Sequence, residues 1–533
     1  MNMMDENLCR TIREQGLTHG GVATYLMGVS ASSETLFAAW CAFLYRRFEQ
    51  DSFDVEILDR HHEEWVGRII KVEVQGDEPA HDFANRTATS FGTAAQNSRI
   101  RSGACAFGFS HFDESTARRE GDIPSLCGDL HLICVSDDLG VKCSISYDHS
   151  RYEEAVVEQM LAQYRALLMA LSTHSDEPLR HLPMLSAEEQ QKLLDQLSGP
   201  ELAPSEYRVF QLIEKHAAER PDAIAVNLNT DSLTYDDLNR AANRMARWLV
   251  QRGVERGSRV AVCMEPRVDF MVCMLAIFKA GATHVPLDPG YPDERLAVIL
   301  EDTSPTVLLT EASLFARLSA LSKQAACLEH MTEELIALSD DNLDYHVDAA
   351  QIAYIVYTSG TTGKPKGVMV SHASLSHYIG VAQTVYGYTT TDIIPAVARY
   401  TFSITFFELL SPLAAGGRLV LLERNHVLDM PRLVKTLTEA TCIHCSPSLW
   451  RKIIGYIDEQ GLAASNFRNM RQVSSGGDMV PPDVLESLKR IFDHAEVFVI
   501  YGCSEISCMG CTYLVPRDRV IERTRVGKPF PNM

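Results

Sequence analysis

Residues 357–372 read Tyr-Thr-Ser-Gly-Thr-Thr-Gly-Lys-Pro-Lys-Gly-Val-Met-Val-Ser-His. This short stretch combines hydroxyl side chains and lysines with glycines, which let the backbone approach a ligand closely. The run before it, residues 351–357, is apolar and rich in strand-forming residues, so it predicts a buried strand. Backbone N–H, hydroxyl and ammonium groups all bind phosphate oxygens. A strand that leads into such a loop therefore indicates a site for a nucleotide triphosphate.

The loop differs from the Walker A sequence, G-x-x-x-x-G-K-[ST], because Pro365 follows Gly363 and Lys364. Instead, residues 357–367 resemble the signature loop of the adenylate-forming superfamily, which comprises acyl-CoA ligases, luciferases and the adenylation domains of nonribosomal peptide synthetases. The resemblance implies that a carboxylic acid reacts with ATP to give an acyl-adenylate and pyrophosphate. A flexible surface loop is the alternative, but such loops seldom combine all three kinds of residue so densely.

The chain has 533 residues and a net charge of −21, which predicts several domains and argues against binding to nucleic acid or to an anionic membrane. No apolar run is long enough to span a membrane, and the N-terminus is acidic where a signal peptide would be basic. Fourteen cysteines are scattered without the spacing of a disulfide scaffold. We therefore expect a soluble, cytoplasmic enzyme with reduced thiols.

The residue pattern predicts an α/β, multi-domain protein with two units, 1–180 and 205–533, joined by a linker at 181–204. Within the linker, Ser186 and Glu189 form a capping-box pattern, and Gly199, Pro200 and Pro204 end the short helix that it predicts. In the first unit, the pattern indicates a mixed arrangement of helices at 35–45 and 152–171 and a strand at 141–147.

In the second unit, Thr234 is placed to cap a helix, with Asp237 favourably located in its first turn. A strand at 259–263 and a helix at 270–279 follow, with Gly281 just beyond the helix end. This alternation of strands and helices continues to the end of the chain. It predicts mostly parallel sheets flanked by helices.

The resemblance to adenylation domains covers almost the whole second unit, because further motifs occur in the family's order: 233–238, 278–292, 402–410, 474–479, 501–505 and 526–532. The linker resembles the join between condensation and adenylation domains, and residues 33–180 are similar to the C-terminal half of a condensation domain. A nonribosomal peptide synthetase is therefore expected. Its partners would be other synthetase modules and a peptidyl carrier domain with phosphopantetheine.

The family's later motifs do not follow residue 532, so the resemblance implies a truncated adenylation core that turns over poorly alone. Residues 61–67, His-His-Glu-Glu-Trp-Val-Gly, imitate the condensation signature H-H-x-x-x-D-G. Val66 replaces the aspartate, however, and the pair follows a helix that belongs to the later half of that domain. We expect no condensation activity from His61 and His62; amide formation that depends on His62 would contradict this.

The resemblance also assigns residues to ATP. The phosphate loop would comprise Thr358, Ser359, Gly360, Thr361, Thr362, Gly363, Lys364 and Lys366. Of these, Lys366 and Thr362 would act in catalysis together with Glu505. Glu505 would also hold Mg²⁺, a hard cation that prefers oxygen ligands. Tyr501 would stack on adenine, Gly476 and Gly477 would let the backbone approach the nucleotide, and Ser504 would contact phosphate or backbone.

The family position that pairs with the ammonium group of an amino-acid substrate is occupied here by Ser403. A hydroxyl cannot neutralise a buried ammonium group, whose desolvation is costly when it is unpaired. We therefore expect a carboxylic acid without a standard α-amine, or an amino acid with a displaced amine; an ordinary amino acid held by another anion is the alternative. The other expected substrate-binding residues are Ile404, Phe407, His444, Val473, Ser475, Ile500, Cys508 and Met509.

Three other interpretations remain at this point. Cys442 with Cys445, and Cys508 with Cys511, have C-x-x-C spacing, which suits zinc or an iron–sulfur cluster, although buried cysteines are more often small apolar residues. A stand-alone acyl-CoA or aryl-acid ligase would use the same chemistry. The third interpretation is a fragment without enzymatic activity that only binds nucleotide or a partner module.

Overall fold

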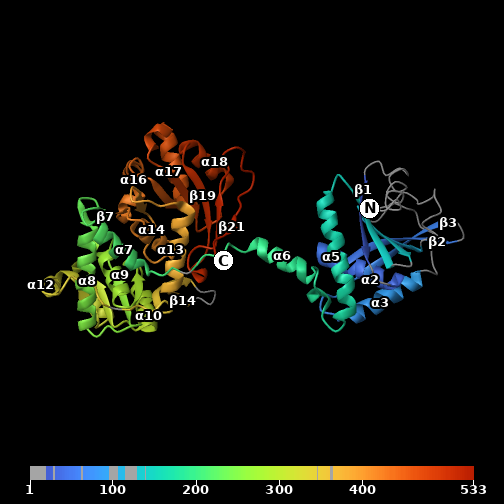
Figure 1. Cartoon of the computed structure of the whole chain (residues 1–533), viewed down its shortest axis with the longest axis horizontal. Helices are drawn as coiled ribbons and strands as arrows, with labels where there is room; N and C mark the ends of the chain where they lie inside the picture. The colour runs from blue at the N-terminus through green and yellow to red at the C-terminus, as the bar shows by residue number, and fades with distance from the viewer. Residues whose placement is uncertain are drawn as a thin grey trace. The chain divides into compact units, whose positions relative to one another are not determined.

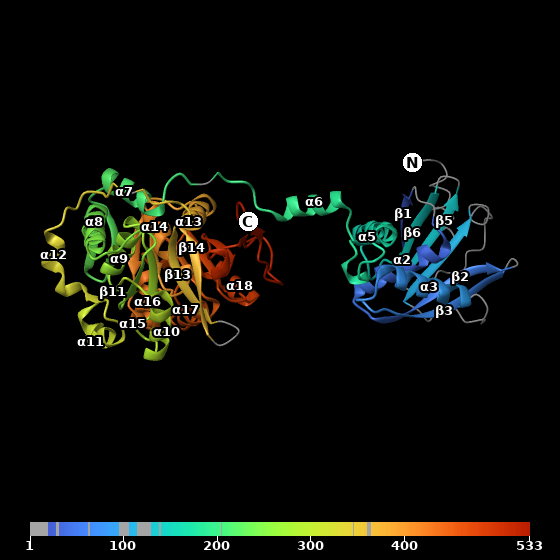
Figure 2. The same cartoon turned by 90° about the horizontal axis from the view of Figure 1, so that it is seen from below.

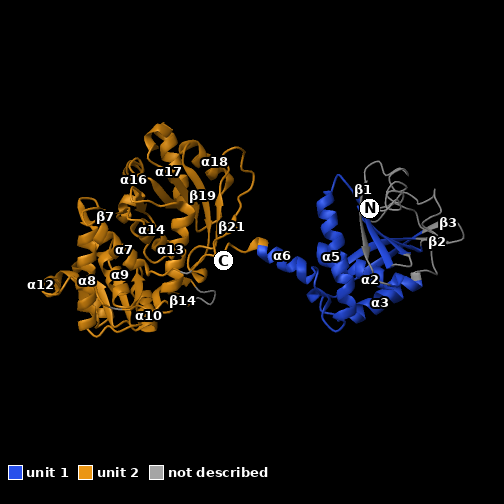
Figure 3. Ribbon diagram, viewed as in Figure 1, with its two compact units in different colours: residues 1–195 blue, residues 196–533 orange. Residues whose placement is uncertain are grey.

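The computed structural model describes residues 20–27, 31–61, 64–94, 106–113, 129–137, 140–203, 205–344, 346–359 and 364–533. Four expected phosphate-loop residues lie outside this set: Gly360, Thr361, Thr362 and Gly363. His62, of the histidine pair, lies outside it as well. The chain divides into two compact units, Met1–Asp195 and Gln196–Met533, and the division falls inside the expected linker (Figure 3).

The first unit contains a six-stranded sheet with the order β1-β6-β5-β4-β2-β3. The pairs β2–β4 and β4–β5 are parallel, and the other neighbouring pairs are antiparallel. Helices pack on one face, where Trp40 and Tyr164 share a core with alternate strand residues. The elements are β1 (Gly20–Met27), α2 (Ser33–Phe48), β2 (Ser52–His61), β3 (Glu64–Glu73), α3 (Ala80–Ala94), β4 (Phe107–Asp113), β5 (Leu130–Asp137), β6 (Gly140–Asp148) and α5 (Glu154–Thr173). The expected helices at 35–45 and 152–171 and strand at 141–147 are present as α2, α5 and β6.

The linker contains the short helix α6 (Ala187–Leu197), none of whose residues is buried. Its predicted capping box is formed: the Glu189 N–H donates to Ser186 Oγ, and the Ser186 N–H and Oγ–H donate to the Glu189 carboxylate. Beyond the helix, the Gly199 N–H donates to the Met533 carbonyl, and the Leu202 N–H donates to Asn532 Oδ1. The end of the linker is thus bonded to the last residues of the second unit.

The second unit contains three sheets (Figures 1 and 2), and their orders are β12-β11-β9-β10-β13-β14, β15-β16-β7-β8 and β17-β18-β19-β20-β21. Neighbouring strands are parallel except for β13–β14, β7–β8, β19–β20 and β20–β21. The predicted architecture, an α/β multi-domain chain with mostly parallel sheets and flanking helices, is therefore confirmed for this unit.

The strands are β7 (Ile224–Leu228), β8 (Asp231–Thr234), β9 (Arg259–Cys263), β10 (Thr283–Leu287), β11 (Val307–Thr310), β12 (Ala325–Cys327), β13 (Ile352–Ser359), β14 (Pro365–Ser371), β15 (Ile393–Ala396), β16 (Arg418–Leu421), β17 (Cys442–Cys445), β18 (Gln472–Gly476), β19 (Glu496–Tyr501), β20 (Cys511–Leu514) and β21 (Lys528–Pro529). The helices are α7 (Val209–Glu219), α8 (Tyr235–Gln251), α9 (Val268–Lys279), α10 (Asp293–Thr303), α11 (Ala312–Leu321), α12 (Thr332–Ile336), α13 (His372–Tyr386), α14 (Ile404–Ala414), α15 (Arg424–Leu428), α16 (Met430–Leu437), α17 (Pro447–Glu459) and α18 (Pro482–Ile491).

Local sequence explains several of these boundaries. Thr234 caps α8 by accepting from the Asp237 N–H, while the Asp237 carboxylate accepts from the Thr234 N–H and hydroxyl, so the predicted cap is present. Gly281 has a φ of 68° just past α9, in the left-handed region that favours glycine. The helix α9 is almost completely buried and belongs to the large core between α8 and the sheets.

The structure differs from the sequence interpretation in one segment that bears on the site. Residues 357–367 were expected to be a loop, but β13 and β14 form an antiparallel pair in which Thr358 lies opposite Lys366. Pro365 is tolerated because it is the first residue of β14, a strand at the edge of the sheet. Lys366 therefore lies on β14, and Lys364 directly precedes that strand.

Within the part of the chain that the structure describes, no helix is long and apolar enough to cross a membrane.

Candidate active site

A pocket with a volume of about 620 Å³ lies among the ends of strands in the second unit. One wall comes from the six-stranded sheet of the second unit, where β13 ends in Thr358 and Ser359. A second wall comes from the third sheet, where β18 and β19 lead into Gly477 and into residues 502–505. The start of α14 supplies Ser403 and Ile404. In open α/β sheets, ligands bind outside the carboxyl ends of the strands, so the position of the pocket is that of a ligand site.

Ten of the expected site residues line this pocket: Thr358, Ser359, Ser403, Ile404, His444, Gly477, Ile500, Ser504, Glu505 and Cys508. Others lie outside its lining. Lys364 and Lys366 are exposed on or next to β14, and Tyr501 is 54% exposed at the end of β19. Gly476, Phe407, Val473, Ser475 and Met509 are buried.

Sequence reasoning did not identify several lining residues: Tyr291, Arg295, Tyr357, Arg399, Thr401, Phe402, Gly502 and Cys503. Two of them are arginines, in a chain whose net charge is −21. Tyr291 follows β10, and Tyr357 lies near the end of its parallel neighbour β13, so the two strands carry these residues to the same edge of the sheet. The Tyr291 hydroxyl donates to Thr401 Oγ1 at 3.1 Å, which ties this edge to the segment before α14.

The glycines at the third sheet are required by close backbone contacts. A Cβ on Gly476 would lie 2.2 Å from the Ile500 carbonyl oxygen, and one on Gly502 would lie 1.9 Å from the Cys508 carbonyl oxygen. Gly477 has a φ of 78°, in the left-handed region. Gly477 and Gly502 both line the pocket, and glycine is required by the positive φ at Gly477 and by the close backbone contact at Gly502.

Glu505 lies on a single 3₁₀ turn, Ser504–Ile506, that is held by its own backbone. The Ser507 N–H donates to the Ser504 carbonyl, and the Cys508 N–H donates to the Cys503 carbonyl. Ser507 and Cys508 have φ values of 63° and 99°, a conformation that costs a non-glycine residue energy and that is common at functional sites. The turn leaves Glu505 exposed beside the pocket.

The part of the pocket around Ser403 and His444 is uncharged. Ser403 is 9% exposed, and its Oγ accepts a hydrogen bond from the Ser504 hydroxyl at 3.1 Å. His444 is buried, its ring meets the Phe407 ring edge to face, and its Nδ1 lies 3.0 Å from Ser474 Oγ. Burial lowers the pKa of His444 to about 4, so this imidazole is neutral at pH 7.

Glu408 is buried in α14 close to this pocket. Its Oε2 accepts hydrogen bonds from the Val397 and Ala398 N–H groups at 2.8 and 2.9 Å. Burial raises the pKa of Glu408 to about 8, which outweighs these two hydrogen bonds. The side chain is therefore mostly protonated at pH 7. It does not supply a negative charge beneath the pocket.

The pKa of Glu408 predicts a specific dependence of stability on pH. Because its folded-state pKa of about 8 lies above its ordinary value of 4.5, the folded state holds a proton that the unfolded state loses. The contribution of Glu408 to the unfolding free energy is fully present below pH 4.5 and is lost as the pH rises towards 8. Between pH 5.5 and 8, the wild type should lose unfolding free energy on the order of 3 kcal/mol through this group. We expect Glu408→Gln, which keeps the acceptor but cannot ionise, to remove this loss.

Denaturant unfolding of the wild type and of Glu408→Gln at pH 5.5 and 8.0 measures this difference. The advantage of the variant in unfolding free energy should widen by about 3 kcal/mol between pH 5.5 and pH 8.0, because the loss in the wild type starts near pH 4.5 and grows by about 1.4 kcal/mol per pH unit. The exposed residue Glu459 provides the control variant Glu459→Gln. If the wild type and Glu408→Gln lose stability in parallel over this range, Glu408 is ionised in the folded protein.

The cysteines of the C-x-x-C pairs have the environment of packed thiols. Burial raises the pKa of Cys442 to about 12 and raises those of Cys445 and Cys508 well above the ordinary range. Metal ions bind the thiolate, and these groups are held as thiols. Among the described residues, no group of three or more His, Cys, Asp or Glu side chains is placed to hold a metal ion.

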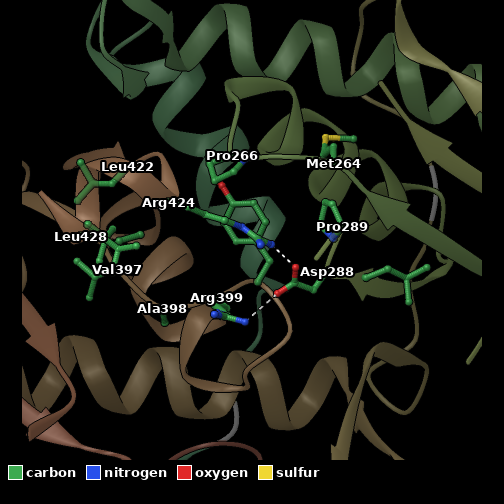
Figure 4. A pocket seen from close by; sticks show the side chains of 14 residues that line it. Met264, Pro266, Asp288, Pro289, Val397, Ala398, Arg399, Leu422, Arg424 and Leu428 are labelled. Atoms are coloured by element: carbon green, nitrogen blue, oxygen red, sulfur yellow. Dashed lines mark hydrogen bonds and ion pairs between the residues drawn. The ribbon is translucent and has the colours of Figure 1, made fainter. Parts of the chain in front are cut away.

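A second pocket of about 370 Å³ adjoins the first at Arg399, which lines both. Its walls are largely apolar, and the Asp288 carboxylate lies in it with only 3% of the residue exposed. Figure 4 shows the guanidinium groups of Arg424 and Arg399 directed at this carboxylate. Asp288 also accepts from the Gly290 N–H at 2.7 Å. Its charge is therefore balanced within the protein.

Comparison with known proteins identifies the family of the second unit. Residues 213–533 match the model of the family described as AMP-binding enzyme. Gramicidin S synthase 2 of Brevibacillus brevis is 30% identical over 408 residues, which are 76% of this chain and 9% of that protein. Surfactin synthase subunit 1 of Bacillus subtilis (strain 168) is 29% identical over 420 residues, 76% of this chain and 11% of that protein. The chain thus spans about a tenth of the length of these relatives.

Solved structures share the fold at low sequence identity. The nonribosomal peptide synthetase FmoA3 (S1046A) in its AMPPNP-bound form has a TM-score of 0.79 at 17% identity, over 96% of this chain and 60% of that one. The four-domain nonribosomal peptide synthetase holo-AB3403, bound to AMP and glycine, has a TM-score of 0.72 at 18% identity, over 96% of this chain and 42% of that one. Because the family match covers more than half of its length, the chain belongs to the AMP-binding enzyme family.

Proposed function

We propose that this chain activates an organic acid as an acyl-adenylate at the expense of ATP, as the adenylation part of a nonribosomal peptide synthetase. The observation that carries the proposal is the single pocket in which the end of β13, the Glu505 turn and the hydroxyl of Ser403 meet. The family membership and the synthetase relatives support it.

In the proposed reaction, a carboxylate oxygen of the acid attacks the α-phosphorus of ATP. A new P–O bond forms to the acid, the bond between the α-phosphorus and the bridging oxygen breaks, and pyrophosphate leaves with the bond electrons. Two anions must meet and charge builds on the phosphates, so catalysis requires fixed donors and cations. Thr358 and Ser359 supply donors at the end of β13, beside the loop that carries the other expected phosphate ligands.

The residues present fit a Mg²⁺ ion. Within the described residues, the Glu505 carboxylate has no hydrogen bond or ion pair, and it is exposed beside the pocket. Mg²⁺ in such enzymes is held by one or two carboxylates, water and substrate phosphates, so one free carboxylate is an adequate protein ligand. When bound there, the ion would neutralise phosphate charge.

For the nucleoside, we assign the Gly476–Gly477 turn as the close backbone contact, Tyr501 as the ring that stacks on adenine, and Ser504 as a nearby donor. The 54% exposure of Tyr501 leaves its ring available for stacking. The absence of a side chain at Gly476 lets its backbone lie close to the Ile500 carbonyl, so the ends of β18 and β19 stay together next to Tyr501 in sequence.

The acid is proposed to lack a standard α-amine. Glu505 is the one acidic residue among those that line the pocket in the described part of the chain. Ser403 offers a hydroxyl, His444 is neutral at pH 7, and the nearby Glu408 is mostly protonated. An ammonium group placed at Ser403 would lose its hydration without gaining a counter-ion. An α-hydroxy, α-keto or aryl acid avoids this cost, and the apolar residues Ile404, Phe407 and Ile500 suit a medium-sized apolar or aromatic side chain.

The domain assignment completes the proposal: residues 1–180 as the C-terminal half of a condensation domain, 181–204 as the linker and 205–533 as the adenylation core. Support comes from structural likeness to synthetases over 96% of the chain, which includes the first unit. The adenylate would then pass to the phosphopantetheine thiol of a carrier domain. His61 and His62 receive no catalytic role in this assignment.

The test is ATP–pyrophosphate exchange with matched acids that differ only at the α-carbon, such as leucine, 2-hydroxy-4-methylpentanoate and 2-oxo-4-methylpentanoate. We expect exchange with a hydroxy or keto acid to exceed that with the amino acid by at least about tenfold, because an unpaired buried charge costs more than about 1.4 kcal/mol. A strong preference for the amino acid would reject the substrate class. Absence of calorimetric heat with magnesium–ATP would reject the adenylation function itself.

A further inference from the structure

The pocket holds a guanidinium group that has no hydrogen bond or ion pair among the described residues. Arg295 lines the pocket from the first turn of α10, and its guanidinium carbon lies 4.1 Å from the centre of the Tyr291 ring. Within the described residues, no hydrogen bond or ion pair engages this side chain, and its Nε is buried without a partner. A stacked guanidinium is oriented by the ring beneath it, so its remaining N–H groups are prepared to bind an anion.

A nearby arginine, Arg317, has a structural role that Arg295 lacks. Arg317 donates to the Pro289 and Tyr291 carbonyls at 2.7 and 2.6 Å, and its Nε donates to the Asp293 carboxylate at 2.7 Å. Arg317 therefore fixes the segment between β10 and α10. Because Arg317 holds the backbone, the position of Tyr291 does not depend on Arg295. The fold of this segment therefore does not require a cation at position 295.

The position of Arg295 indicates which part of the ligand it meets. The strands β10 and β13 are parallel neighbours, with His284 paired to Tyr354, so their carboxyl ends lie at one edge of the sheet. The segment after β10 carries Tyr291 and Arg295, and the end of β13 carries Thr358 and Ser359. Arg295 therefore lies on the phosphate-loop side of the pocket, whereas the Gly477 turn and Tyr501 belong to the third sheet.

The other pocket arginine is less suited to this role. Arg399 is 64% exposed at its side chain, and its Nη1 lies 3.5 Å from Asp288 Oδ2 in the adjoining pocket (Figure 4). The exposed lysines Lys364 and Lys366 lie outside the lining. Arg295 is the pocket cation that is both stacked and without a counter-ion among the described residues.

Resting on the function proposed above, we infer that Arg295, positioned by Tyr291, binds the β- and γ-phosphates of ATP and the pyrophosphate that leaves. A guanidinium group offers paired N–H donors that match two phosphate oxygens, and such charge-assisted bonds are about twice as strong as neutral ones. The contact would favour both binding of the triphosphate and separation of charge as pyrophosphate departs.

The test measures binding to the whole chain by calorimetry, with metal-free pyrophosphate, magnesium–ATP and AMP as probes. Arg295→Gln should weaken binding of pyrophosphate and of ATP by about tenfold, the usual worth of one hydrogen bond to a charged group. Its affinity for AMP should stay within about twofold of the wild type, since AMP lacks the phosphates in question. Tyr291→Leu should weaken pyrophosphate binding by about threefold through loss of the stack, and Tyr291→Phe should not.

Arg490→Gln is the matched control, because Arg490 forms an exposed ion pair with Asp458 on the surface of the same unit. It should bind all three probes as the wild type does. Thermal unfolding of Arg295→Gln should stay close to that of the wild type, because the side chain makes no hydrogen bond with any described residue. Unchanged pyrophosphate binding in Arg295→Gln, or an equal loss of AMP and ATP, overturns the inference alone. If the wild type binds neither ATP nor pyrophosphate, both the inference and the proposed function are rejected.

Discussion

Glu505→Gln should lower ATP–pyrophosphate exchange by about 10³-fold, the loss typical when one group that stabilises phosphate charge is removed from an active site. The amide keeps the size of the side chain but loses the negative charge that a magnesium ion requires. Because Glu505 is exposed and makes no hydrogen bond within the described residues, the substitution should change the unfolding free energy by less than about 0.5 kcal/mol.

The measurement combines exchange rates over a range of Mg²⁺ concentrations with AMP binding in the presence of EDTA. If Glu505 holds the metal, the variant needs a higher Mg²⁺ concentration and binds AMP normally. Glu522→Gln removes another exposed carboxylate of the same unit and should behave as the wild type. An exchange rate within about threefold of the wild type, less than 1 kcal/mol in barrier height, would exclude Glu505 as the metal ligand.

Local sequence signals predicted much of the framework around this residue. The capping box at Thr234, the strand at 259–263 and the helices at 35–45 and 152–171 depend on neighbours in sequence, and all are present. The hairpin of β13 and β14 was missed because glycines and Pro365 disfavour a strand. Pairing with the preceding buried strand outweighs that local preference, and it places Lys366 opposite Thr358.

The site was predictable where a motif carries the chemistry and was missed where only folding brings residues together. Ser403, Glu505 and Ser359 come from three separated motifs, and all three line one pocket. Tyr291 and Arg295 reach the same pocket because β10 pairs with β13, a contact between segments more than sixty residues apart that no local pattern reports. The signal in the sequence was a tyrosine and an arginine at positions i and i+4, within the 278–292 motif and just beyond it.

Ser403→Asp should reverse the preference between acids. A carboxylate at this position would face the α-ammonium group of an amino acid in a pocket with 9% exposure at Ser403. Pairing a buried charge, compared with leaving it unpaired, is worth about 2–5 kcal/mol, so the ratio of exchange with leucine to exchange with 2-hydroxy-4-methylpentanoate should rise by about 100-fold or more. The change is tolerable in the fold, because Ser403 precedes the first turn of α14, where acidic residues are favourable.

Ser403→Asn separates charge from size in this experiment. It has nearly the volume of aspartate and can accept the Ser504 hydrogen bond, but it carries no charge, so it should leave the preference for the hydroxy acid in place. If Ser403→Asp does not increase ATP–pyrophosphate exchange with leucine, the α-carbon of the acid does not lie next to Ser403. If the wild type already prefers leucine and Ser403→Asp adds less than about threefold, under 1 kcal/mol, another anion pairs with the amine. Because Glu408 is mostly protonated at pH 7, that anion would be Glu505 or a group outside the pocket lining.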